Sequence, residues 1–410
     1  MNNKVFLHKF YLFFIKTFYI ERGVFFIHQW INSWGYLPIR FYLDDSNVKN
    51  RIQRVFAKNN VNGDQIRILF SNLHGKEPIH FEQLNITKSR SISNSVPYSF
   101  VPISFNNKKE IILNPQESVY SDVVELNVNE GEFIVLDIYT SNLPSTISST
   151  FFFKDQPITS VFELSERTQN QFMQQILSDH ENAYLYGFFQ IEVNTKEDVK
   201  TIVTFGDSIT HDSKWAAPLA QNLYSKYPAK VSLINYGISG NRLLFDSEPN
   251  YFFGDAGIKR FEKDVFENNN KVDLVIVLEG TNDIVHPLTG TAPLSEKISS
   301  QDIIDGLKVL IEQAHNHSTK IILGTITPFY NYQSCWTKTE EKKRNTINEW
   351  IRNSSEPDGY IDFDKILRDP KDPKRLYYEY DKGDNLHLSK KGGQKLSDSV
   401  DLEWLLGLCN

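Results

Sequence analysis

The sequence predicts an α/β protein: a doubly wound parallel-sheet domain of flavodoxin-like type, preceded by an antiparallel β-sandwich domain. Three observations lead to this prediction. The chain has 410 residues, more than one typical domain. In the N-terminal half apolar residues alternate with polar ones, as in strands buried on one face. After residue 194 continuous apolar runs alternate with helical patterns, as in a parallel sheet covered on both sides.

The change of pattern divides the chain into three expected segments. They are an N-terminal extension over residues 1–27, a jelly-roll-like β-sandwich over residues 28–194 and the α/β domain over residues 195–410.

The expected extension is aromatic and apolar. His8, Lys9 and Lys16 interrupt its apolar run, and no small-residue cleavage motif follows. The segment therefore resembles a secretion signal poorly and is too short in apolar length to span a bilayer. We expect a frayed or partly docked segment, with an uncleaved membrane-associating segment as the alternative.

Period-two patterns mark the strands expected in the β-rich half. In residues 64–72, Ile66, Ile68 and Phe70 share one face, and residues 132–139 form a largely apolar run typical of a buried strand. Further strands are expected at 51–57, 79–87, 99–105, 119–128 and 185–193. Clusters rich in Asn, Gly and Lys separate these strands, and many short strands separated by turns are typical of an antiparallel sandwich.

In the C-terminal half, β-branched and apolar runs alternate with amphipathic patterns. Strands are expected at 201–205, 231–236, 272–278, 320–326 and 360–363. Helices are expected at 216–227, 258–266, 301–315, 340–352 and 389–405, the third capped by Ser299 or Ser300. This alternation is typical of βαβ units and predicts the doubly wound layer fold.

Composition excludes several classes of protein. Lys and Arg number 44 against 51 Asp and Glu, a net charge of −7, so no basic field exists to bind nucleic acid. Cys335 and Cys409 form no CxxC pair, and neither metal-binding nor nucleotide-binding motifs occur. We expect catalysis without a metal or cofactor and a chain without an integral membrane span. We expect a cytoplasmic location by default, with secretion or surface association as the alternative, and leave the oligomeric state open.

Reactive side chains follow the ends of the expected parallel strands. The first strand ends in Gly206–Thr210 (GDSIT), the second in Gly237–Asn241 (GISGN) and the third in Glu279–Asp283 (EGTND). Asp384–His387 precedes the last helix. Because the carboxyl ends of parallel strands meet at one edge of a sheet, we expect these groups to converge there. A serine, glycine amides, a side-chain amide and an Asp/His pair are the parts of an acyl-transfer site.

These four blocks, in this order, resemble the GDSL or SGNH family of serine hydrolases, and the resemblance extends over the whole C-terminal half. Finer matches at Trp215, Asn241–Leu244, Leu278–Pro287 and Ile361–Asp364 resemble the esterase branch of that family that has an N-terminal β-domain.

The resemblance implies that Ser208 is the nucleophile, His387 its general base and Asp384 the residue that orients His387. It also implies an oxyanion hole formed by the backbone amides of Ser208 and Gly240 and the side-chain amide of Asn282. The chemistry agrees, because a serine hydroxyl needs an adjacent base and histidine is the side chain that titrates near neutrality. Asn282 can donate a hydrogen bond to a developing oxyanion without adding charge.

Other polar residues near these blocks have less specific expected roles. We expect Asp207 and Asp283 to cap helices or brace loops, and His315 and His317 to close a helix. The loops 243–253 and 286–293 are the expected pocket walls, and the substrate-pocket candidates are His211, His286, Leu243 and Phe245.

The sequence thus predicts a metal-independent carboxylic-ester hydrolase whose partner is a small ester or an acylated carbohydrate. A preference for short acyl esters of carbohydrate rests on the family resemblance alone. Two alternatives stay open: a lipase or thioesterase for longer acyl chains, and a non-catalytic glycan-binding module on a hydrolase scaffold.

Overall fold

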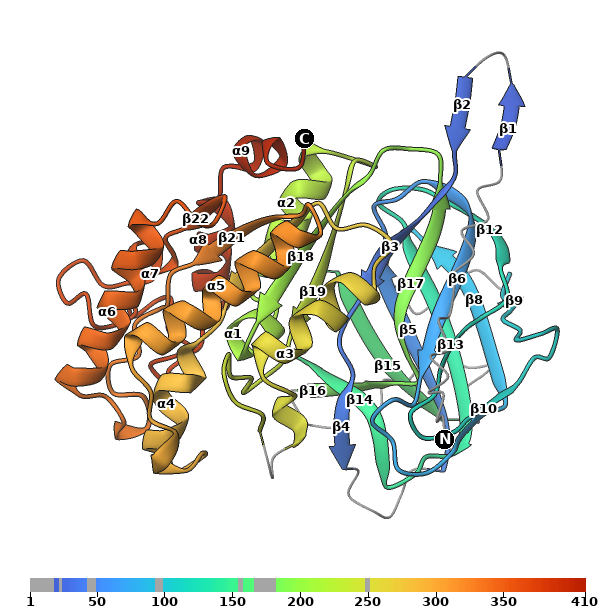
Figure 1. Ribbon diagram of the computed structural model, residues 1–410. Helices are drawn as coiled ribbons and strands as arrows, with labels where there is room; N and C mark the ends of the chain where they lie inside the picture. Colours follow the sequence, from blue (N-terminus) through green and yellow to red (C-terminus); the bar gives the residue numbers. More distant parts are fainter. Residues whose placement is uncertain are drawn as a thin grey trace, which may run out of the picture.

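The computed structural model describes residues 18–21, 24–42, 49–92, 99–153, 158–165, 182–247 and 251–410. Most of the expected N-terminal extension, residues 1–17, lies outside this description. Its described part consists of β1 (Phe18–Glu21) and β2 (Val24–Ile27), which pair in antiparallel fashion. In Figure 1 this pair projects beyond the rest of the β-rich part.

The β-rich part contains two five-stranded antiparallel sheets with a shared core. One sheet is formed by β11 (Ser118–Tyr120), β6 (Gly63–Ser71), β17 (Phe188–Thr195), β3 (Gln29–Gly35) and β12 (Val124–Val128). The other is formed by β15 (Thr159–Ser165), β5 (Lys49–Lys58), β13 (Phe133–Asn142), β8 (Gln83–Ser89) and β9 (Val101–Pro102). Ile66 and Ile68 of β6 share one buried cluster with Ile134 and Leu136 of β13. The predicted antiparallel, β-rich region is therefore confirmed.

Two smaller antiparallel sheets complete this part. They are β16 (Asn182–Tyr186), β14 (Thr146–Phe153) and β4 (Ile39–Tyr42), and the pair β10 (Ile111–Leu113) with β7 (Ile79–Phe81).

Several expected strands of the β-rich part differ from those observed. The single strand expected at 185–193 is two strands, β16 and β17, in different sheets. Gly187 lies between them with φ +91°, and a side chain there would collide with the Phe81 ring. The expected strands 79–87 and 119–128 are likewise each divided in two.

The C-terminal part contains a five-stranded parallel sheet. Its order is β19 (Val231–Gly237), β18 (Lys200–Gly206), β20 (Leu274–Leu278), β21 (Lys320–Gly324) and β22 (Gly359–Ile361). In order of appearance along the chain this is 2-1-3-4-5, the flavodoxin-like order. Every residue of β20 is buried, so both faces of the sheet are covered. The predicted doubly wound fold is confirmed.

Helices connect these strands. The α-helices are α1 (Ser208–His211), α2 (Ala216–Lys226), α3 (Gly257–Phe261), α4 (Thr281–Thr289), α5 (Ser300–Asn316), α6 (Lys338–Asn353), α7 (Phe363–Leu367), α8 (Lys390–Asp398) and α9 (Leu402–Gly407). Short helical segments are η2 (Tyr251–Phe253), η3 (Glu262–Glu267), η4 (Leu294–Glu296) and η5 (Tyr332–Ser334). Helix α5 lies beside α3 and α6, whereas α2 lies beside α8. No helix within the described ranges is both long and apolar enough to cross a membrane.

Two expectations about the helices are wrong in detail. The single helix expected at 389–405 is interrupted after Asp398, because Asp401 begins a new helix by accepting hydrogen bonds from the amides of Glu403 and Trp404. The loop expected at 286–293 begins inside α4, which continues through His286 and Pro287.

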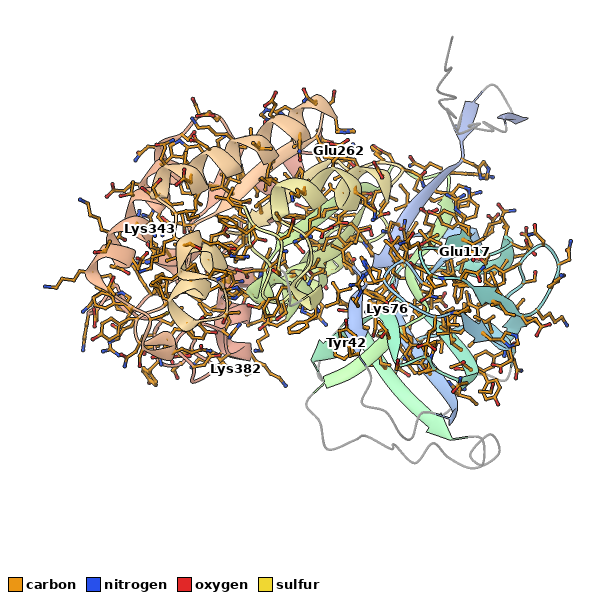
Figure 2. The ribbon with its side chains drawn as sticks, turned by 60° about the horizontal axis from the view of Figure 1, so that its bottom comes forward. Tyr42, Lys76, Glu117, Glu262, Lys343 and Lys382 are labelled. Carbon is orange, nitrogen blue, oxygen red and sulfur yellow. The ribbon has the colours of Figure 1, made fainter. Side chains whose placement is uncertain are left out.

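The two parts meet along β19, the edge strand of the parallel sheet. The Asn32 side chain of β3 donates to the Tyr236 hydroxyl at 3.1 Å and to Asn269 Oδ1 at 3.0 Å. Ser232 Oγ donates to the Asn32 carbonyl at 2.7 Å, and Asn60 Nδ2 to the Val231 carbonyl at 2.7 Å. Figure 2 shows the side chains of the two parts along this junction, with Lys76 on the β-rich side. The junction is therefore buried and hydrogen-bonded.

Candidate active site

Ser208 is the first residue of α1, directly after the turn that follows β18 at the carboxyl edge of the parallel sheet. Asp207 caps α1 by accepting a hydrogen bond from the Ile209 amide at 2.9 Å, as expected for a structural carboxylate. A Cβ atom on Gly206 would lie 2.2 Å from the Leu278 carbonyl oxygen, so this tight turn requires glycine. The turn leaves Ser208 half-buried at the sheet edge.

The loop before α8 brings His387 to Ser208 across 179 residues of sequence. Ser208 Oγ lies 2.8 Å from His387 Nε2, and His387 Nδ1 lies 2.7 Å from Asp384 Oδ2. An ionised carboxylate can only accept, so Nδ1 donates to Asp384 and Nε2 accepts the serine proton. The three residues form one hydrogen-bonded chain with the direction that proton transfer from serine requires.

Backbone contacts hold Asp384 in its ionised form. Its Oδ1 accepts from the amides of Leu386 at 3.0 Å and His387 at 2.8 Å. Burial alone would raise the pKa of this carboxyl, but hydrogen bonds from the ring and amide of His387 lower it well below the usual range. These contacts favour the ionised form of Asp384, which can stabilise an imidazolium.

Gly240 lies on the loop after β19, and Asn282 lies at the start of α4, which follows β20. Gly240 has φ +77°, and a side chain there would collide with the Phe253 ring. Asn282, in the first turn of α4, donates one amide hydrogen to the Asn241 carbonyl at 2.9 Å. The Ile238 amide donates to the Gly206 carbonyl at 2.9 Å and ties this loop to the serine turn. Hydrogen bonds thus connect Asn282 to the loop that contains Gly240, and connect that loop to Gly206, two residues before Ser208.

A buried polar network supports these loops from beneath. Asp283 accepts from the amides of Leu243 at 2.7 Å and Leu244 at 2.9 Å, as a bracing carboxylate should. Arg260 donates to Asn241 Oδ1 at 2.8 Å and to the Gly206 carbonyl at 3.0 Å. Sequence reasoning missed Arg260, because nothing in its helix pattern distinguishes it from a surface cation.

Glu279 lies in the same network with no exposed side-chain area, 3.8 Å from Arg260. Burial, and then the charge of Asp207, raise the pKa of Glu279 well above its usual value. Glu279 is thus protonated more readily than an exposed glutamate, because burial and the nearby carboxylate disfavour a further negative charge.

The four pocket candidates lie in different surroundings. His211 is the last residue of α1, the helix that begins with Ser208, and its Nε2 lies 3.1 Å from Thr150 Oγ1 of β14. The β-rich part therefore contacts this helix. The ring of His286 packs 5.3 Å from that of Phe253, and burial lowers its pKa to about 4. Leu243 is fully buried in the α/β core, whereas Phe245 is half-buried with the Arg242 guanidinium 5.0 Å from its ring.

Tyr332 also lies at the site, although sequence reasoning did not select it. Its ring centroid is 6.4 Å from that of His387, nearly perpendicular to it. The signal that could have found it is the run of aromatic residues Phe329, Tyr330, Tyr332 and Trp336, which follows the fourth parallel strand.

Neither cysteine forms a disulfide, since Cys335 and Cys409 are both free and buried. Among the residues that the structure describes, no group of three or more His, Cys, Asp or Glu side chains is placed to hold a metal ion.

A Ser–His–Asp chain at the carboxyl edge of a 2-1-3-4-5 parallel sheet is the arrangement of a serine hydrolase. Residues 204–395 match the model of the GDSL-like Lipase/Acylhydrolase family. This part of the chain is a GDSL-like lipase/acylhydrolase domain, and the protein is an enzyme that acts on ester bonds.

Solved structures similar to this chain include an acetyl xylan esterase variant from Geobacillus stearothermophilus. The two are 19% identical over 52% of this chain and 97% of the other, with a TM-score of 0.39. A GDSL-like lipase from Bacteroides thetaiotaomicron is 19% identical over 48% of this chain and 84% of the other, with a TM-score of 0.35. A comparison with curated proteins finds no match.

Proposed function

We propose that the enzyme hydrolyses short-chain carboxylic esters, such as acetyl groups on carbohydrate, through a Ser208 acyl-enzyme. The observation that supports this most is the hydrogen-bonded chain from Ser208 Oγ through His387 to Asp384.

In the proposed first step, Ser208 Oγ attacks the ester carbonyl carbon while His387 Nε2 takes the hydroxyl proton. Asp384 stabilises the imidazolium that forms. The carbonyl oxygen becomes an oxyanion, which accepts hydrogen bonds from the amides of Ser208 and Gly240 and from Asn282 Nδ2. Asn282 has a second amide hydrogen that its bond to Asn241 does not use.

In the following steps His387 gives this proton to the oxygen of the leaving alcohol, and the C–O bond breaks. Water then attacks the acyl-enzyme, with His387 taking its proton and returning it to Ser208 Oγ. The products are a free carboxylic acid and an alcohol. The cycle needs no further group.

Packing around Gly240 supports a small acyl group. The Phe253 ring lies against Gly240 and is itself packed on His286. Together these rings limit the space beside the proposed oxyanion hole. We infer that this packing favours a short acyl group over a long chain.

Hydrolysis of p-nitrophenyl acetate tests the proposal. Ser208→Ala should abolish turnover, whereas the matched control Ser399→Ala, at an exposed serine outside the site, should leave it unchanged. A fluorophosphonate probe should label wild type and not Ser208→Ala. Equal turnover in both proteins, or no labelling of wild type, would refute the role of Ser208, and the latter would favour a non-catalytic glycan-binding module.

A series of p-nitrophenyl esters from acetate to palmitate tests the acyl preference. We expect kcat/KM to be highest for the shortest esters and to fall as the chain lengthens. A maximum at long chains, or a preference for acyl thioesters, would replace this proposal by the lipase or thioesterase alternative.

A further inference from the structure

The proposed mechanism places the leaving alcohol beside His387, because His387 Nε2 must reach the alcohol oxygen to give it a proton. The residues that flank the His387 ring therefore border the alcohol part of the substrate. Tyr332 is such a residue: its half-buried ring meets the His387 ring nearly edge-on, with 6.4 Å between centroids.

The segment that presents Tyr332 has an unusual backbone. Asn331, Gln333 and Ser334 have φ values of +73°, +43° and +57°, in the region that favours glycine. Three such residues around one aromatic ring cost conformational energy, and strain of this kind gathers at functional sites. The backbone around Tyr332 thus adopts an unfavourable conformation while the ring lies beside His387.

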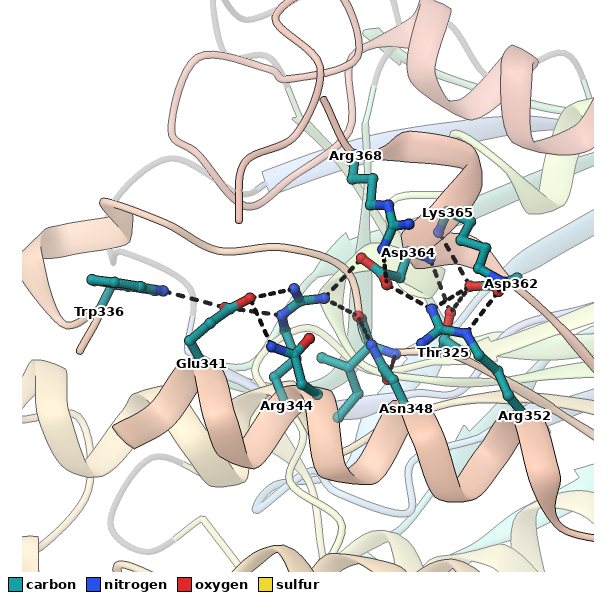
Figure 3. Close-up of polar contacts among 12 residues, drawn as sticks. Thr325, Trp336, Glu341, Arg344, Asn348, Arg352, Asp362, Asp364, Lys365 and Arg368 are labelled. Atoms are coloured by element: carbon teal, nitrogen blue, oxygen red, sulfur yellow. Dashed lines mark hydrogen bonds and ion pairs between the residues drawn. The ribbon is translucent and has the colours of Figure 1, made fainter. Parts of the chain in front are cut away.

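Trp336 lies at the end of the same segment and is fixed by an ionic network (Figure 3). Its indole N–H donates to Glu341 Oε2 at 3.3 Å, and Glu341 accepts from Arg344 at 2.6 Å. Arg344 is buried and reaches Asp364 at 2.9 Å. The orientation of the indole ring is therefore set by side chains packed in the core.

Trp336 lines a surface groove of about 470 Å³. Polar residues also line the groove, among them Lys342, Asn345 and Glu349 of α6 and Lys374. An aromatic ring with amide, ammonium and carboxylate groups around it suits a sugar, whose ring has an apolar C–H face and a rim of hydroxyls.

We propose that Tyr332 and Trp336 form a saccharide subsite for the leaving alcohol of the ester. Tyr332 binds the sugar that bears the scissile ester, and Trp336 binds a further sugar unit in the groove. The proposal rests on the function proposed above and names the alcohol half of its substrate.

Three acetate esters with alcohols of increasing size test the subsite: ethyl acetate, fully acetylated xylose and acetylated xylo-oligosaccharide. Acid release is followed by titration. Tyr332→Ala should raise KM about tenfold for both sugar esters, a loss of about 1.4 kcal/mol of binding, and should have a clearly smaller effect on kcat/KM for ethyl acetate. Trp336→Ala should raise KM for the oligosaccharide alone.

Conservative variants separate ring contact from support of the loop. Tyr332→Phe and Trp336→Phe keep an aromatic face and should retain most of the affinity, and Tyr360→Ala, at an exposed tyrosine of β22, serves as the matched control. Equal losses on ethyl acetate and on the sugar esters would overturn the subsite, because Tyr332 would then only position His387. Failure of the proposed function looks different: wild type and Ser208→Ala would hydrolyse every ester equally.

Discussion

Asn282 is the residue whose proposed role is easiest to isolate. Asn282→Ala removes a donor to the oxyanion, and loss of one such donor typically lowers kcat by about 10²–10³-fold. Asn282→Asp has nearly the same shape but offers no N–H when ionised, so it should lose as much. We expect both variants to keep the circular dichroism spectrum of wild type. A loss of less than about tenfold in kcat on p-nitrophenyl acetate would remove Asn282 from the oxyanion hole.

Asp207 should make stability depend on pH. Burial raises its pKa to about 7, although the Ile209 amide hydrogen bond lowers it. In the unfolded chain the pKa of the same carboxyl is about 3.9. At pH values between about 3.9 and about 7 the folded state therefore binds more protons than the unfolded state. The free energy of unfolding therefore falls as pH rises from about 4 to about 7, and this contribution stays lost above that range.

Asp207→Asn tests this directly, because asparagine still accepts the Ile209 hydrogen bond but has no charge to bury. The Tm of the variant minus that of wild type should increase from about pH 4 to about pH 8. Asp384 has a lowered pKa, so its own contribution to stability is lost as the pH falls. Both proteins contain Asp384, so this contribution largely cancels in the difference between their Tm values. If the Tm difference between Asp207→Asn and wild type did not change with pH, the pKa of Asp207 would not be raised in the folded state.

At the scale of elements, α6 and α7 are joined by the network in Figure 3. Asp364 is buried at the start of α7 and accepts from Arg344 at 2.9 Å, Arg352 at 2.6 Å and Arg368 at 3.2 Å. Asp364→Ala would leave the guanidinium groups of these three arginines without the carboxylate that they share. We therefore expect this variant to lower the free energy of unfolding by about 3 kcal/mol.

Urea denaturation measures this loss. The control is Lys308→Ala, which breaks an ion pair with Glu356 whose two side chains are 40% and 45% exposed. We expect this exposed pair to contribute less than about 1 kcal/mol. Similar losses in Asp364→Ala and Lys308→Ala would mean that the network does not stabilise the contact between α6 and α7.

Strands and helices of the α/β domain differ in how well they could be predicted from the sequence. Strands such as β20 were predictable because each is a continuous apolar run, and burial on both faces requires such a run. Helix α4 was not, because Pro287 normally ends a helix, whereas here burial of residues 281–287 outweighs that tendency. The pairing of Ser208 with His387 was expected from family resemblance, since no local pattern links residues 179 positions apart.

For the whole molecule, the sequence contains no signal for the junction between the two parts. Asn32, Asn60 and Ser232 are ordinary polar residues of strands or turns, and only the fold makes them buried partners. The domain boundary at residues 194/195 remains our proposal. Because Thr150 of the β-rich part contacts His211 of the serine helix, we expect the two parts to act as one unit.

Unfolding of the whole chain tests this coupling. Asn32→Ala removes the side chain that donates to both Tyr236 and Asn269, leaving buried polar groups with fewer partners, which costs roughly 1–3 kcal/mol. If the junction couples the two parts, calorimetry should show a single unfolding transition, and Asn32→Ala should move it to a lower Tm. Near-ultraviolet circular dichroism should show the same single transition and the same shift. Asn114→Ala, which removes an exposed side-chain hydrogen bond to Glu117 inside the β-rich part, should hardly move it. Two separate transitions, with Asn32→Ala shifting only one of them, would show that the β-rich part and the hydrolase domain unfold independently.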